Sequence, residues 1–146
     1  TVVATDVSSE ALTKARRLAD EHGARVDFRL VDVHDWAWPS AEYDAVVGVF
    51  IQFSPPSQRA LVFDAIKRAV RPGGLVLLHG YTPEQVELGT GGPSEPDFMY
   101  TPQLLERAFV GWSCVKLRTY EKELQEGNRH VGRSALIDFV ARRPAE

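Results

Sequence analysis

Apolar and polar residues follow one another along this chain in an order that predicts an α/β protein. Short apolar or β-branched runs at residues 1–5 and 43–50 each predict a strand, and the first run ends at Asp6. Apolar residues that alternate with charged ones over residues 26–30 predict another strand. The run at residues 43–50 is apolar almost throughout. This pattern is typical of a central parallel strand, because helices then cover both of its faces.

Apolar residues at helical spacing separate these strands. Over residues 11–21 they lie on one face, behind the capping pair Ser8-Ser9. A second apolar stripe occupies residues 61–70, with Ser57 placed to cap it and the sequence Arg-Pro-Gly-Gly at residues 71–74 to end it. Both stretches therefore predict helices that connect parallel strands.

The second half of the chain begins with a buried strand at residues 75–78. An irregular segment rich in Gly, Pro and Thr follows at residues 80–100, and a Thr-Pro pair begins a predicted helix at residues 101–109. Two last strands, at residues 113–123 and 135–142, flank a polar turn and are expected to pair antiparallel. The order is therefore β-α-β-β-α-β-loop-α-β-β, an open and mostly parallel sheet with a C-terminal antiparallel hairpin.

Length and composition limit the classes of partner that we expect for this chain. The 146 residues fit a single domain over residues 1–146, and the charged fraction of 25% is ordinary. No apolar run approaches the roughly 20 residues that span a bilayer. The net charge of −3 gives no electrostatic reason for a nucleic-acid surface. We therefore expect neither a membrane nor a nucleic acid as a partner. The single cysteine, Cys114, suits a reducing cytoplasm, and the four histidines lack metal-ligand spacing.

Four stretches carry a resemblance to a known family: Val3-Ala4-Thr5-Asp6-Val7-Ser8, Leu30-Val31-Asp32-Val33, Tyr43-Asp44-Ala45-Val46-Val47 and Val70-Arg71-Pro72-Gly73-Gly74-Leu75. In this order and at these intervals, the sequence resembles class I, Rossmann-like S-adenosylmethionine-dependent methyltransferases from their second strand to their seventh. It looks closest to the small-molecule enzymes of the tellurite-resistance type. The resemblance implies a Rossmann-like sheet, S-adenosylmethionine as cofactor, and transfer of a methyl group to a small-molecule acceptor.

The resemblance also implies a cofactor site, and open α/β sheets bind ligands beyond the carboxyl ends of their strands. Asp6 is expected to accept hydrogen bonds from both ribose hydroxyls. Asp32 is expected to accept one from the adenine amino group, while the backbone amide of Val33 contacts the ring edge. Val7 is expected to provide apolar contact to the adenine, and Phe50 is expected near the methyl group.

Other interpretations of these residues stay open. A strand-terminal aspartate often only caps the turn that follows it, although two such residues on consecutive strands favour ligand binding. Trp36 either contacts the adenine or supports the loop around it.

Catalytic candidates are few, because methyl transfer is accelerated largely by positioning and needs a base only when the acceptor must lose a proton. Relatives often have histidine where Gln52 stands. Glutamine is not a base near neutral pH, so we expect Gln52 to orient the acceptor by hydrogen bonding. In the terminal hairpin, Arg129 suits an anionic acceptor and His130 is able to accept a proton. The alternative for these two residues and for Arg133 is a solvated hairpin tip.

Three further residues are candidates for substrate binding. Arg133 lies in the hairpin, and Tyr81 and Tyr100 stand at the two ends of the irregular segment. The tyrosines either line the acceptor pocket or anchor the segment to the core. Within that segment, residues 89–93 (Gly-Thr-Gly-Gly-Pro) are similar to a phosphate cradle but do not join a strand to a helix. They predict a flexible loop over the active site instead.

One part of the family pattern is absent from this sequence. Only five residues precede Asp6, whereas these enzymes carry a strand and a glycine-rich loop before their ribose-binding acid. The absent strand normally lies between the strands that end at Asp6 and at Phe50. We expect upstream residues, a rearranged sheet, or self-association to provide the missing pairing.

Two other functions compete with the methyltransferase. A non-catalytic binding or scaffold domain is favoured by the absent glycine loop and by Gln52, and opposed by Asp6 and Asp32. A nicotinamide-dependent reductase also holds adenosine with strand-terminal acids. Its short-chain class, however, needs a tyrosine followed four residues later by lysine, and none of the four tyrosines here has that spacing.

Overall fold

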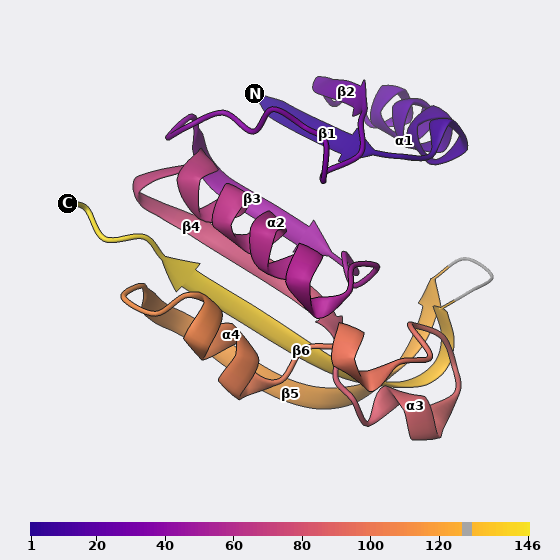
Figure 1. The fold of residues 1–146 in the computed structure, drawn as a ribbon. Coiled ribbons are helices and arrows are strands. Elements are labelled where there is room, and N and C mark those ends of the chain that lie inside the picture. Colours follow the sequence, from indigo (N-terminus) through magenta and orange to yellow (C-terminus); the bar gives the residue numbers. More distant parts are fainter. Residues whose placement is uncertain (127–129) are drawn as a thin grey trace. The chain divides into compact units, whose positions relative to one another are not determined.

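The computed structural model describes residues 1–126 and 130–146, and these divide into two compact units. The first unit is Thr1–Ala37 and the second is Trp38–Glu146. Each has its own hydrogen-bonded sheet, with two strands in the first unit and four in the second (Figure 1). No strand ladder joins the two sheets within the described residues. A single domain over residues 1–146 stays a prediction.

The first unit is a β-α-β element, as the sequence predicted. Strand β1 (Val2–Asp6) pairs in parallel with β2 (Val26–Leu30), and helix α1 (Ser9–Glu21) connects them. Ser8 caps the N-terminus of this helix, because its Oγ accepts a hydrogen bond from the Ala11 amide. In the parallel register Asp6 lies opposite the last residue of β2, so both strands end at the same edge.

The second unit contains a mixed sheet in the order β3-β4-β6-β5. Strand β3 (Tyr43–Val49) runs parallel to β4 (Val70–Tyr81), and helix α2 (Pro56–Ala69) connects them. Strands β5 (Ser113–Glu126) and β6 (His130–Arg142) form the predicted antiparallel hairpin, and β6 pairs with β4. The hairpin is longer than predicted, since its polar residues continue the backbone ladder beyond the apolar alternation that marked the strands.

The Arg-Pro-Gly-Gly turn at residues 71–74 lies inside β4 rather than before it. Val70 already pairs with Tyr43, and the regular register resumes at Leu75. Gly73 has a φ of +78°, and a Cβ on Gly74 would lie 2.7 Å from the Asp44 carbonyl oxygen. The two glycines therefore let the chain turn tightly against β3 while the ladder continues on both sides.

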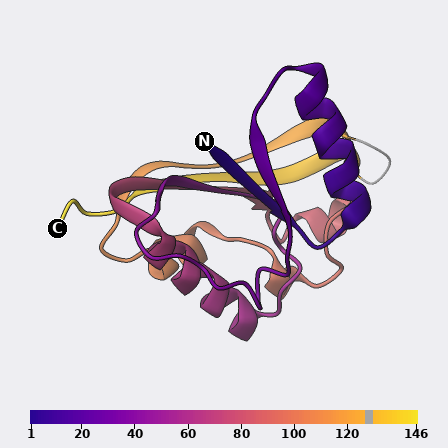
Figure 2. The same ribbon diagram turned by 90° about the horizontal axis from the view of Figure 1, so that it is seen from above.

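Helices α2 and α4 (Pro102–Ala108) lie on the same side of the four-stranded sheet (Figure 2). The core there is aromatic. The ring centroid of Phe109 is 5.5 Å from that of Phe63 and 5.3 Å from that of Phe139. Burying these rings and their aliphatic neighbours supplies the main driving force for packing the helices onto the sheet. The buried aliphatic residues around them include Ile66, Val76, Leu78, Leu105 and Ile137.

Within the second unit, helices cover one face of β3 and leave the other exposed. Val47 is 62% exposed and Val49 is 54% exposed, although both belong to the apolar run that indicated a doubly covered strand. Successive side chains of a strand point to opposite faces, and α2 and α4 cover only one face of this sheet. The apolar run correctly indicated that both faces of the strand carry apolar side chains. It did not indicate which elements cover each face.

The irregular segment between β4 and α4 contains two short elements, α3 (Gln85–Leu88) and the 3-10 turn η1 (Pro96–Phe98). In the described part of the chain, no helix has the length and apolar character required to cross a membrane.

Helix ends provide a test of the local structure. Thr101 Oγ1 accepts a hydrogen bond from the Leu104 amide, 3.1 Å away, at the start of α4. Ser57, by contrast, is not a cap: α2 begins at Pro56, and its N-cap residue, Pro55, makes no side-chain cap bond. We expect Thr101→Ala to lower the free energy of unfolding by about 1 kcal/mol through loss of the cap. Ser57→Ala should change it by less than about 0.5 kcal/mol. Urea unfolding followed by circular dichroism measures both, and equal losses would contradict the assignment.

Candidate functional site

The chain makes a sharp turn at the carboxyl end of β3, where Phe50 stands. Phe50 has a φ of +52°, a left-handed conformation that is rare for a residue with a side chain. Its amide donates to the carbonyl of His79, 2.8 Å away. Its ring lies against those of His79 and Tyr81, with centroid distances of 4.9 and 4.7 Å. Strain held in place by surrounding contacts is common at binding sites. The position of Phe50 near the methyl group of the cofactor stays a prediction.

Gln52 is buried, and its side-chain amide makes the two hydrogen bonds that a neighbouring backbone would make. Its Oε1 accepts from the Tyr81 amide at 2.6 Å, and its Nε2 donates to the Tyr81 carbonyl at 2.8 Å. The side chain thus pairs with the end of β4 as a neighbouring strand does. Gly80 permits this approach, because a Cβ there would lie 2.5 Å from Gln52 Oε1. The described contacts of Gln52 are structural, and its acceptor-orienting role stays a prediction.

Gln52 also lines an open hollow of about 310 Å³. The loop after β3 contributes Phe53 to this hollow, and the irregular segment contributes Pro93, Ser94, Glu95 and Phe98. The irregular segment therefore does lie against the loop at the end of β3. Its glycine run does not form a phosphate cradle: Gly89 ends α3, and a Cβ on Gly92 would lie 2.7 Å from the Tyr81 ring.

Tyr81 and Tyr100 anchor the two ends of the irregular segment. Both are almost fully buried, and the Tyr100 amide donates to the Tyr81 carbonyl at 3.0 Å. The Tyr100 ring packs against Phe63. Its hydroxyl makes no hydrogen bond within the described residues, and burial raises the pKa of Tyr100. Of the two alternatives that the sequence left open, the structure shows the anchor, and direct substrate contact stays a prediction.

In the first unit, Asp6 and Asp32 each use one carboxylate oxygen to hold a turn. Asp6 Oδ1 accepts from the Ser8 amide at 2.7 Å. Asp32 Oδ1 accepts from the His34 amide at 2.9 Å and lies 2.7 Å from His34 Nδ1. The backbone hydrogen bond from His34, followed by its side chain, lowers the pKa of Asp32. Among the described residues, nothing binds the second oxygen of either carboxylate.

The surroundings of these carboxylates are partly apolar. Val7 is exposed next to Asp6, and Val33 and Trp36 are half-buried after Asp32. Asp6 is the last residue of β1 and Asp32 lies two residues beyond the end of β2, and the two strands are neighbours in the sheet. The turn-capping interpretation of these aspartates is therefore true of one oxygen in each, while the other remains able to accept from a ligand. A ribose diol and an adenine amino group, which need anionic or carbonyl acceptors, fit this arrangement.

Of the three candidate residues in the hairpin, the structure describes the side chain of one. Arg129 and the side chain of His130 lie outside the described residues. Arg133 is described: its Nε pairs with Glu121 Oε2 on the neighbouring strand, and its carbonyl accepts from Thr90 Oγ1 at 2.6 Å. The guanidinium is therefore partly neutralised, and its predicted role in substrate binding stays a prediction.

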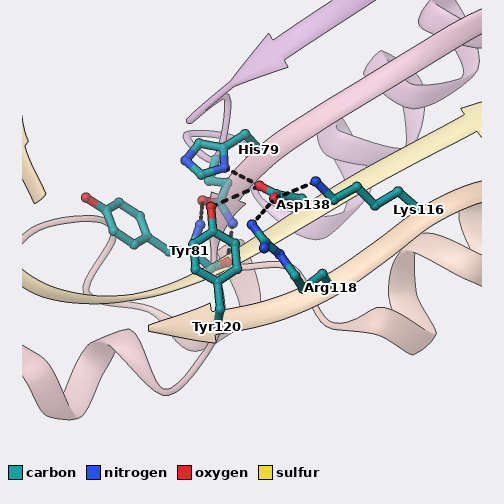
Figure 3. Close-up of polar contacts among 7 residues, drawn as sticks. His79, Tyr81, Lys116, Arg118, Tyr120 and Asp138 are labelled. Carbon is teal, nitrogen blue, oxygen red and sulfur yellow. Dashed lines mark hydrogen bonds and ion pairs between the residues drawn. The ribbon is translucent and has the colours of Figure 1, made fainter. Parts of the chain in front are cut away.

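One polar cluster in the second unit was missed by the sequence reasoning (Figure 3). Asp138 on β6 lies opposite His79 on β4 and Arg118 on β5. Its Oδ1 is 2.9 Å from His79 Nδ1 and accepts from the Tyr120 hydroxyl at 3.1 Å, and its Oδ2 accepts from Arg118 at 2.9 Å and lies 3.5 Å from Lys116 Nζ. Arg118 and Asp138 lie on predicted strands, and His79 directly follows the strand predicted at residues 75–78, but only the strand register brings these side chains together.

Charge stabilisation within this cluster is mutual. Burial alone would raise the pKa of Asp138, but hydrogen bonds from His79, Arg118 and Tyr120 outweigh it and hold that pKa below its usual range. Burial, with the charge of Asp138, raises the pKa of Tyr120. Asp138 is therefore an anion across the physiological range, and Tyr120 keeps its proton.

Comparisons with known proteins bear on this arrangement. A family model described as a methyltransferase domain matches residues 1–74, just over half of the chain. This chain belongs to that family. The predicted class, a class I S-adenosylmethionine-dependent methyltransferase, is confirmed, and S-adenosylmethionine is the cofactor of this class. The match also decides against the reductase alternative. No curated protein matches the chain.

Solved structures show the same fold at low identity. TehB from Haemophilus influenzae is 15% identical, with 97% of this chain and 49% of that chain covered and a TM-score of 0.73. A methyltransferase from Methanosarcina mazei is 16% identical, with 99% and 82% covered and a TM-score of 0.76. The N-methyltransferase NodS from Bradyrhizobium japonicum, in complex with S-adenosylhomocysteine, is 11% identical, with 97% and 66% covered and a TM-score of 0.71.

These structures confirm the predicted Rossmann-like fold with its mixed sheet. This chain spans from about half to about four fifths of their lengths. The finer placement near tellurite-resistance enzymes stays a prediction, because a likeness at 15% identity shows the fold alone.

The double hydrogen bond of Gln52 gives a stability test. In Gln52→Glu a carboxylate would replace the amide that donates to the Tyr81 carbonyl, so we expect the free energy of unfolding to fall by about 1–3 kcal/mol near pH 7. The loss should shrink in acid, because a buried glutamate has a raised pKa in the folded state and regains its proton there. Gln58→Glu, on the exposed first turn of α2, is the matched control and should not destabilise. Urea unfolding at pH 4 and pH 7 measures these effects, and equal behaviour of the two variants would contradict the structural role.

Proposed function

We propose that this chain forms the adenosine-binding edge and part of the acceptor site of an enzyme that methylates a small molecule. The observation that carries this proposal is the pair of carboxylates, Asp6 and Asp32, at the ends of neighbouring parallel strands. Both lie within the stretch that the family model matches, and each keeps one oxygen without a protein partner in the described structure.

The two aspartates have different roles in this proposal. Asp6 accepts hydrogen bonds from the ribose hydroxyls through Oδ2, while its Oδ1 stays bound to the Ser8 amide. Asp32 accepts from the adenine amino group, and the Val33 amide contacts the ring edge. Val7, which is exposed, packs on the adenine face. Because the turn-forming bonds fix each carboxylate in advance, little side-chain freedom is lost when the ligand binds.

The chain's contribution to the chemistry is positioning. The bound cofactor supplies a methyl group activated by its sulfonium, so the protein has to hold the acceptor in line with that group and keep water away. Phe50, held by the rings of His79 and Tyr81, places an apolar wall at the end of β3. Orientation of the acceptor by Gln52, and contacts from Arg129, His130 and Arg133, complete the proposal.

A small-molecule acceptor is supported by the hollow beside Gln52. Its volume of about 310 Å³ is at the lower end of the range for small-molecule sites, and its lining mixes aromatic and polar residues. The net charge of −3 does not favour a nucleic acid as the acceptor. Tyr81 and Tyr100 fix the two ends of the segment that lines this hollow. A cytoplasmic location stays a prediction from the single cysteine.

Titration with S-adenosylhomocysteine tests the cofactor site. We expect Asp6→Ala to weaken binding by about 1–3 kcal/mol, or roughly 5- to 150-fold, because the ribose hydroxyls lose a charged acceptor. Asp32→Ala should weaken it as well, by the loss of the adenine contact. Asp20→Ala, on the exposed face of α1 in the same unit, is the control and should leave the affinity within about twofold. Isothermal titration calorimetry gives the three values.

The outcomes separate the remaining functions. An unchanged affinity in Asp6→Ala would remove the ribose assignment while leaving the family intact. Failure of the parent chain to bind S-adenosylhomocysteine would favour the scaffold alternative, in which the fold is kept without its cofactor.

A further inference from the structure

His79 stands at the carboxyl end of β4, beside the loop at the end of β3. In register it lies opposite Val49, the last residue of β3, and its ring meets that of Phe50 edge to face at 4.9 Å. This position is at the edge of the sheet where open α/β proteins bind their ligands. The His79 side chain is 28% exposed, so its ring is held by neighbours without being sealed off.

The two ring nitrogens of His79 have different surroundings. Nδ1 lies 2.9 Å from Asp138 Oδ1, which favours a proton on Nδ1, because a carboxylate only accepts. Nε2 has no partner within the described residues, and in Figure 3 the second ring nitrogen points away from Asp138. A neutral ring in this tautomer presents an unshared electron pair at Nε2. That is the state a histidine needs to remove a proton.

Asp138 is itself held by its neighbours, so it keeps its negative charge and orients the ring of His79. Its two oxygens are bound by Arg118 and Tyr120 as well as by His79, and Lys116 lies 3.5 Å away. These are the titratable and charged groups that face His79 across the sheet, all from β5 and β6, while β3 presents the apolar Val49. A fixed carboxylate stabilises the imidazolium that forms when Nε2 takes a proton.

We propose that His79 is the general base of methyl transfer in this protein and that Asp138 is its positioning residue. The proposal rests on the function proposed above and adds the acceptor class: a molecule whose attacking oxygen, sulfur or nitrogen bears a proton. His79 Nε2 takes that proton while a lone pair of the acceptor atom forms a bond to the methyl carbon. The carbon–sulfur bond breaks with its electron pair passing to sulfur, and the imidazolium later releases its proton to water.

This assignment explains how the chain manages without a base at position 52. The amide of Gln52 is occupied by the backbone of Tyr81 and does not take up protons near neutral pH. The ring of His79 contacts that of Phe50, so His79 lies next to the same loop.

Two small aromatic probe acceptors, both with a methyl group opposite the attacking atom, test the proposal. 4-Methylphenol must lose a proton when it is methylated, whereas 4-methylpyridine has none to lose on its attacking nitrogen. In the full chain with S-adenosylmethionine, we expect His79→Gln to lower methylation of 4-methylphenol by roughly 100- to 10,000-fold. The same variant should leave methylation of 4-methylpyridine within about twofold. His22→Gln, at the exposed C-cap of α1, is the control and should change neither rate.

A measurement without turnover tests the pair directly. Nitrogen-15 NMR of labelled histidine should show His79 protonated on Nδ1 and not on Nε2 near pH 7.5. In Asp138→Asn, whose amide can donate to Nδ1, the Nε2-protonated form should increase, and methylation of 4-methylphenol should fall with it while that of 4-methylpyridine does not. An Nε2-protonated ring in the parent protein would overturn the base assignment.

The outcomes also distinguish this proposal from the one on which it rests. If S-adenosylhomocysteine fails to bind the parent chain, the proposed function fails and the base role falls with it. S-adenosylhomocysteine can instead bind equally well to the parent chain and to His79→Gln. If 4-methylphenol is then methylated at the same rate by both, or by neither, only the base assignment is overturned. A loss on both probes together would also overturn it, because it would show a role in positioning and not in proton transfer.

Discussion

The hydrogen bonds at Tyr81 connect the parts of the chain that surround the candidate acceptor site. The Gln52 side chain binds both the N–H and the C=O of Tyr81, and the Tyr100 amide binds the same C=O. The loop after β3, the end of β4 and the start of α4 are thereby held at one residue. Leaving a buried polar group unpaired costs about 1–3 kcal/mol, so these segments keep a single arrangement. The left-handed Phe50 depends on it too, because its ring rests on Tyr81.

Three aspartates differ in how many of their carboxylate oxygens bind other parts of the protein. This number indicates whether the aspartate can bind a ligand or instead orients a neighbouring side chain. Asp6 and Asp32 each use one oxygen for a local turn and leave the other to accept from a ligand. Asp138 uses both oxygens within the sheet, for four partners from two strands. It is thus unsuited to hold a ligand of its own, but well suited to fix the ring of His79. Proposals for the cofactor and for the base therefore follow from the same kind of observation.

The sequence predicted local structure well and side-chain partnership poorly. Periodicity located β1, α1, β2 and β3, and the caps Ser8 and Thr101 follow from residue type and spacing alone. The Gln52–Tyr81 bonds join residues 29 apart, and the His79–Asp138 contact joins residues 59 apart, so both depend on strand register. Ser57 was misplaced as a cap because a proline at the first helical position competes with it for the helix start. The Arg129 and His130 hypotheses fall outside the described residues.

The bond between Tyr81 and Tyr100 also defines a boundary. It closes residues 82–99 into a loop whose two ends are fixed to each other as well as to the core. Within this loop Gln85 and Met99 are buried, and Gln85 Oε1 accepts from the Ala135 amide of β6, so these residues are tied to the core. The exposed positions between them, such as Ser94 and Glu95, can change in number or composition while the sheet and α4 keep their places, because the entropy of closing a loop changes only slowly with its length. Since this loop provides most of the lining of the hollow beside Gln52, acceptor preference in such a protein is separable from its folding. The fold thus carries a natural exchange point, at which a segment from a related protein could be transplanted to change what is methylated.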